Sequence, residues 1–187
     1  MDAFSYLSVL LSIILGLAIT QILQGYRSLL LGRGRVRFYW LSLTWSALIL
    51  VMATQLWWAS FGLARHRAWT FPQFAVVLLQ TVLLYMMAAL VLPDMPHGAP
   101  VDLRDHYYRE RRVFFGLFLV MLAVSIGKDW VLQGRLPTAD NLAFHGLFGL
   151  LALGGLAIRK PRYHEIATPL GALAMGAYVA LLYARLA

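Results

Sequence analysis

The sequence lacks cysteine altogether, and only 13% of its 187 residues are charged, against about a quarter in soluble domains. Without cysteine, the chain has no disulfides, thiolate metal sites or cysteine nucleophiles. It also has no glycine-rich phosphate loop and no GxSxG or HExxH motif. The first apolar run is too long for a cleavable signal peptide, and its only early charge is Asp2. No motif therefore names a reaction.

Apolar residues make up 61% of the sequence, and the mean hydropathy is +0.71. The charges cluster between apolar runs, so we expect the chain to be dissolved in lipid, because a soluble fold of this size has too little interior to bury that surface. The net charge of +8 is explained by Arg residues that flank the apolar runs, as topology signals do. The expected partners are membrane lipids; we expect no nucleic acid and no cofactor.

Six apolar segments, each near the ~20 residues of a spanning helix, predict one all-α domain over residues 1–187. The predicted spans are about 4–31, 38–63, 71–92, 111–132, 141–158 and 165–186. Eleven of the 16 Lys and Arg residues follow the first, third and fifth spans. The positive-inside rule puts these connections in the cytoplasm and both termini on the extracytoplasmic side. The preference for Arg over Lys indicates a GC-rich bacterial genome and hence a bacterial inner membrane.

The cytoplasmic loop 93–110 is the longest and most polar connection. Its prolines and glycine predict an irregular first half. Asp102 is a candidate N-cap for a following helix, with Asp105 supporting the first turn. That helix either lies in the interface before the fourth span or extends the span towards its N-terminus.

A stripe of small and polar residues runs along the first span at steps of three or four. It comprises Ser5, Ser8, Ser12, Gly16, Thr20 and Gln24. At ~100° per residue these positions share one slowly drifting face. One interpretation is a packed seam with other helices, including those of another subunit. The other is a wetted pathway or ligand groove.

A second polar group is predicted in the outer leaflet. It comprises Gln55, Lys128, Asp129, Asn141 and His145. Ionisable groups at membrane depth are costly and suggest function. Alternatively, Lys128 extends to the headgroups and Asp129 only marks a helix end. His145 suits proton transfer, since its unperturbed pKa is ~6.5; the alternative is a packing role.

Histidines and a carboxylate near the cytoplasmic side form a third group, a candidate divalent-metal site. Its members are His97, His106, His164 and Glu165. Histidine and carboxylate mixtures suit such metals, but a solvated loop of paired charges explains the same residues. Haem between two spans is not expected, because His145 has no histidine partner at matching depth.

The sixth span carries a further stripe at steps of four, made of Thr168, Ala172, Gly176 and Ala180. The fifth span is rich in glycine. Small residues at this spacing allow helix backbones to approach closely. We therefore predict close packing of the fifth and sixth spans.

The first functional hypothesis is a small homo-oligomeric channel or facilitator for ions or small solutes. Its polar pathway would be the stripe of the first span together with the outer-leaflet group. The second is a non-transporting binding, scaffold or sensor subunit that recognises lipid or partner helices, with dry stripes. The third is a metal-dependent membrane enzyme that uses the cytoplasmic His/Asp/Glu group.

Overall fold

The computed structural model describes residues 3–66, 68–94 and 100–182. Their main elements are six helices: α1 (Ala3–Leu31), α2 (Trp40–Ser60), α3 (Phe71–Val91), α4 (Leu103–Gln133), α5 (Ala139–Ala157) and α6 (Pro161–Leu182). All six are long and apolar enough to cross a membrane. The all-α, six-span prediction is therefore confirmed, and the chain is a multi-pass membrane protein.

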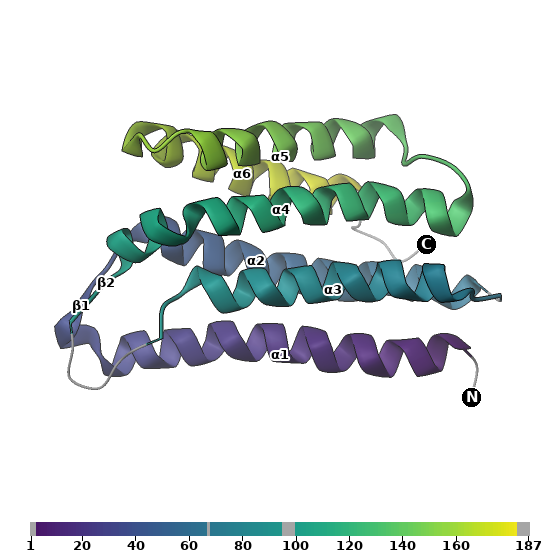
Figure 1. Ribbon diagram of the computed structural model, residues 1–187, viewed down its shortest axis with the longest axis horizontal. Coiled ribbons are helices and arrows are strands. Elements are labelled where there is room, and N and C mark those ends of the chain that lie inside the picture. Colours follow the sequence, from purple (N-terminus) through teal and green to yellow (C-terminus); the bar gives the residue numbers. More distant parts are fainter. Residues whose placement is uncertain (1–2, 67, 95–99, 183–187) are drawn as a thin grey trace.

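The helices run side by side along one direction, and successive helices alternate in direction (Figure 1). α1 forms one edge of the bundle and packs against α3 and α2, whereas α5 forms the opposite edge and packs against α4 and α6. The most extensive packing is between α3 and α4. This arrangement leaves α2, α3, α4, α5 and α6 around a common interior.

The connections at one end of the bundle meet in a short parallel ladder. β1 (Val36–Arg37) follows the 3-10 turn η1 (Arg33–Arg35), and β2 (Val101–Asp102) directly precedes α4. Val36 pairs with Val101 and Arg37 with Asp102. The Arg37 guanidinium lies 3.3 Å from the Asp102 carboxylate. The ladder therefore marks one end of the bundle, which we call the ladder end.

α4 begins at Leu103 rather than at Arg111, so the structure extends the predicted fourth span towards its N-terminus. The Asp102 carboxylate caps it by accepting hydrogen bonds from the backbone N–H of Arg104 at 2.8 Å and of Asp105 at 3.2 Å. A satisfied N-cap starts the helix at this residue, because it pairs N–H groups that lack a helical partner.

The other helix bounds fall within four residues of the predicted ones among the residues that the structure describes. The predicted second span ends in a 3-10 turn, η2 (Phe61–Arg65), and the predicted end of the sixth span at residue 186 lies outside the described residues. α3 starts at a capping box in which Thr70 and Gln73 bond each other's backbone N–H groups. α4 ends at Gly134, whose φ of 66° is left-handed.

Candidate functional site

Two small cavities lie inside the bundle, in the half away from the β1–β2 ladder. We call the first the central cavity. It measures about 50 Å³ and includes Gln55, Gln80, Ser125, His145 and Tyr178 in its lining. We call the second the distal cavity. It measures about 40 Å³, and its lining includes Ser60, Gln80, Thr81 and Lys128. Both are otherwise lined by apolar side chains.

Gln80 on α3 lines both cavities, so its side chain forms their shared wall. The residue is only 7% exposed. Its side-chain oxygen Oε1 is buried and has no hydrogen-bond partner among the described residues. An unpaired buried acceptor costs about 1–3 kcal/mol. An occupant that donates a hydrogen bond from either cavity would remove this cost.

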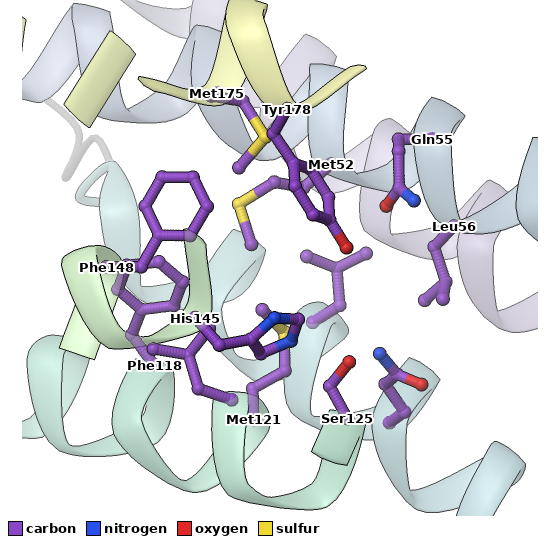
Figure 2. A pocket seen from close by; sticks show the side chains of 13 residues that line it. Met52, Gln55, Leu56, Phe118, Met121, Ser125, His145, Phe148, Met175 and Tyr178 are labelled. Carbon is purple, nitrogen blue, oxygen red and sulfur yellow. The ribbon is translucent and has the colours of Figure 1, made fainter. Parts of the chain in front are cut away.

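His145 on α5 contributes a ring nitrogen to the central cavity. Its Nδ1 lies 2.9 Å from the backbone oxygen of Asn141, and because a carbonyl can only accept, Nδ1 carries the proton. The neutral ring therefore has Nε2 as its acceptor. In Figure 2 the His145 ring and the hydroxyls of Ser125 and Tyr178 point towards the same space.

The hydroxyls that line the distal cavity donate hydrogen bonds to nearby backbone carbonyls. Thr81 Oγ1 donates to the Leu78 oxygen at 2.7 Å, and Ser60 Oγ donates to the Trp57 oxygen at 2.6 Å. Each hydroxyl oxygen then retains only acceptor capacity towards the cavity. The half-buried Lys128 adds an ammonium group, which can only donate.

An aromatic cluster fills the bundle between the central cavity and the ladder end. The Trp45 indole on α2 lies 5.3–5.8 Å from the rings of Phe114, Phe115 and Phe118 on α4. Phe118 also lines the central cavity, so this cluster closes the cavity towards the ladder. Edge-to-face contacts at these distances are favourable beyond their buried area.

Polar contacts hold the bundle together on the ladder side of the cluster. The Trp45 indole N–H donates to Thr168 Oγ1 at 3.1 Å. The Tyr107 hydroxyl donates to His164 Nδ1 at 3.0 Å, because Nε2–H of that ring donates to the Ile158 oxygen at 2.8 Å. These bonds join α2 and α4 to α6, so this end is closed and internally paired.

The buried Arg111 of α4 also belongs to this closed end. Its guanidinium donates to the carbonyl oxygens of Gly155 at 3.1 Å and Leu156 at 2.7 Å. These carbonyls belong to the last turn of α5, where helical partners are missing and the helix dipole favours a cation. In the sequence, Arg111 was counted only as a topology signal.

The predicted outer-leaflet group is partly gathered by the structure. Gln55 and His145 line the central cavity, and Lys128 lines the distal one. Asn141 lies one turn before His145, and its Oδ1 is buried without a partner among the described residues. Asp129 is half-buried and lines neither cavity.

The stripe of the first span does not line this interior. α1 buries a different face, which carries Leu7, Leu11, Leu15, Ala18 and Ile22. Most of the stripe is exposed on the outside of the single chain, namely Ser12, Gly16, Thr20 and Gln24, whereas Ser5 and Ser8 are half-buried.

Internal hydrogen bonds already pair part of this stripe. Thr20 Oγ1 donates to the Gly16 oxygen at 2.8 Å, and Ser12 Oγ accepts from the Trp57 indole at 3.2 Å. A groove of about 280 Å³ beside Trp57 is lined partly by Ser8 and Ser12.

Within the described residues, no three His, Cys, Asp or Glu side chains are grouped to hold a metal ion. His106 is paired with the Leu90 oxygen at 2.9 Å and the Arg109 guanidinium at 3.2 Å. His164 is paired as described above, Glu165 is exposed, and His97 lies outside the described residues.

The glycine contacts of α5 explain how it packs. A Cβ on Gly154 would clash with the Tyr163 side chain of α6, and a Cβ on Gly155 would lie 2.8 Å from the Phe115 ring of α4. α5 and α6 are thus neighbours, although α5 packs more extensively on α4. Within the predicted stripe of α6, Thr168 is buried, Ala172 is half-buried, and Gly176 and Ala180 are exposed.

Tyr39 and Asp102, at the ladder end, lie outside the spans and have shifted pKa values. Burial, helped by a hydrogen bond with the Tyr108 hydroxyl, raises the pKa of Tyr39 above its usual range. At Asp102, desolvation acts to raise the pKa, but the two backbone N–H bonds and the Arg37 guanidinium outweigh it and lower the pKa. Asp102 is thereby held ionised as the cap of α4.

Gln80 is the residue of this site that the sequence analysis missed. Its signal was available, because a lone amide near the middle of a 21-residue apolar helix is costly unless it is paired. Ser125 and Tyr178 gave no comparable signal, because a single Ser or Tyr is common in apolar helices.

Comparison of the chain with protein-family models, curated proteins and solved structures finds no match.

Proposed function

We propose that this multi-pass membrane protein is a facilitator for a small polar solute and that the solute occupies the central and distal cavities. The observation that carries the proposal is the buried, unpartnered Oε1 of Gln80 in the wall between the two cavities. Polar groups inside a membrane are retained where they serve a solute path or a binding site. The proposed pathway thus lies in the interior of the bundle, where the distal cavity also touches Leu11 and Leu15 of α1, and not along the stripe of α1.

The distribution of polar and aromatic side chains supports a path that is closed at one end. Both cavities with their polar residues lie in the half of the bundle away from the ladder, and the cluster around Trp45 packs between the central cavity and the ladder end. Passage then requires Phe118, which borders the central cavity, to change rotamer. Side-chain and helix rearrangements of this kind occur on timescales from nanoseconds to milliseconds.

The test is solute flux into liposomes that contain purified protein, measured for wild type and Gln80→Leu. We expect Gln80→Leu to abolish flux, because it removes the amide from both cavities at similar side-chain volume. Gln133→Leu is the matched control, since it makes the same change at an exposed position at the end of α4 that lines neither cavity. Equal loss in both variants, or no loss in either, would refute the proposal.

A second proposal, from another class, is that the stripe of α1 binds a helix of a second subunit. The supporting observation is that Gly16 is exposed and that a Cβ there would meet no atom within 4 Å in the described residues. Small-residue seams allow close helix contacts in membranes.

We expect Gly16→Leu to shift the protein towards the monomer, as measured by mass in detergent. Leu17→Ala, on a lipid-facing position of the same helix, should leave the oligomer unchanged. An unchanged mass for Gly16→Leu would remove the α1 stripe from subunit association.

A further inference from the structure

The volumes of the two cavities limit the solute. A cavity of about 150 Å³ is known to accept benzene. The central and distal cavities measure about 50 and 40 Å³, and a water molecule occupies about 30 Å³ in the liquid. Each therefore has space for one or two molecules the size of water and excludes sugars, amino acids and glycerol.

The hydrogen-bonding groups limit the solute further. In the wall of the two cavities, the buried atom Gln80 Oε1 has no partner among the described residues; it is an acceptor and needs a donor. The hydroxyls of Ser60 and Thr81 already donate hydrogen bonds to backbone carbonyls, so their oxygens can only accept. The neutral form of His145 presents Nε2 as a further acceptor. A halide or another anion without protons cannot donate to any of these atoms.

The acceptor atoms disfavour anions, and the charge of Lys128 disfavours cations. Lys128 brings an ammonium group to the distal cavity, and its positive charge repels cations strongly where little water screens it. Asp129 interacts electrostatically with Lys128 and His145, but it lines neither cavity. The other residues that line the two cavities include no carboxylate.

We infer that the solute is a neutral hydrogen-bond donor the size of water, which makes water and ammonia the two representatives of its class. This inference rests on the proposed function. In the occupied state, one solute molecule donates to Gln80 Oε1, and a second donates to Nε2 of His145. Gln80 passes the solute between the cavities because its side chain borders both.

The test compares four solutes in the same proteoliposomes. Osmotic shrinkage measures water, internal alkalinisation after an ammonia gradient measures ammonia, and ion-sensitive dyes measure chloride and potassium. We expect water or ammonia to pass faster than through empty liposomes, and Gln80→Leu to return that rate to the empty-liposome value. Gln133→Leu should retain the wild-type rate, and no variant should pass chloride or potassium.

Different results would show that the solute class is wrong and that the protein is not a facilitator. Chloride or potassium flux that Gln80→Leu abolishes would overturn the solute class while leaving a facilitator. If no solute passes, the proposed function fails, and ¹⁵N NMR of His145 then decides the solute class. The ring signal, assigned by its loss in His145→Gln, should show a protonated Nδ1 and an Nε2 in contact with water. A dry ring, or one protonated at Nε2, overturns the inference.

Discussion

Most buried polar side chains in the described part of this protein have hydrogen-bond partners. Arg111 meets two carbonyl oxygens at the end of α5, and Trp45 meets Thr168. Gln80 Oε1 and Asn141 Oδ1 depart from this pattern, and of these two residues Gln80 lines a cavity that can hold a partner. That departure is the physical basis for placing the site there.

Asp102 provides a prediction at the residue scale, because its lowered pKa links the stability of the fold to pH. A carboxylate with a lowered folded-state pKa stabilises the fold above its unfolded value of about 3.9, and this stabilisation is lost as the pH falls through the folded-state pKa. We expect Asp102→Asn to be less stable than wild type from pH 5 to 8, as measured by thermal unfolding in detergent. The difference should disappear as the pH falls below about 4.

Glu165→Asn is the control for this series, because Glu165 is exposed and should differ little from wild type in stability. A stability gap for Asp102→Asn that persists unchanged at pH 3 would show that the charge of Asp102 does not stabilise the start of α4.

Whole helices were predictable from the sequence, but the faces that they bury were not. Long apolar runs bounded by arginine give the six spans directly, because a membrane imposes their length. Lipid, however, is as apolar as the interior of the bundle, so hydrophobicity does not distinguish the buried face from the lipid face. For this reason the stripe of α1 looked central, whereas α1 buries Leu7, Leu11 and Leu15.

The extent of α4 and the candidate site were predictable to different degrees. Asp102 was identified as a cap, but the choice between an interfacial helix and an extended span depends on how Arg111 and Tyr107 pack. Gln55, Lys128 and His145 were grouped by depth alone, and the structure distributes them over two cavities. The position of Gln80 between those cavities depends on the rotation of α3 about its own axis in the bundle, which the sequence does not specify.

The glycines of α5 give a prediction at the element scale. A Cβ at Gly155 would press on the Phe115 ring at 2.8 Å, whereas a Cβ at Gly149 would meet no described atom within 4 Å. We expect Gly155→Ala to destabilise the protein by about 1–3 kcal/mol through overpacking. Gly149→Ala should be neutral or stabilising by up to about 1 kcal/mol, since alanine favours helix. Equal effects in detergent unfolding would contradict this packing of α5 on α4.

The whole molecule is asymmetric along the direction of its helices. One half is closed by aromatic rings and paired polar groups, and the other contains both cavities. The basic connections lie at the ladder end, so the positive-inside rule would place the cavities towards the extracytoplasmic side. That orientation, the bacterial inner membrane and a homo-oligomer stay predictions.

Water in the interior around Gln80 can be tested by the reactivity of a single thiol placed there. Because the sequence has no cysteine, Ser125→Cys puts the only thiol in the central cavity. Ala123→Cys, two residues away on the exposed surface of α4, is the matched control facing lipid. We predict that hydrogen peroxide, a neutral hydrogen-bond donor close to the size of water, oxidises the thiol of the Ser125→Cys protein in proteoliposomes and spares that of the Ala123→Cys protein. An unreactive Ser125→Cys protein, or equal reaction of both, would contradict the account.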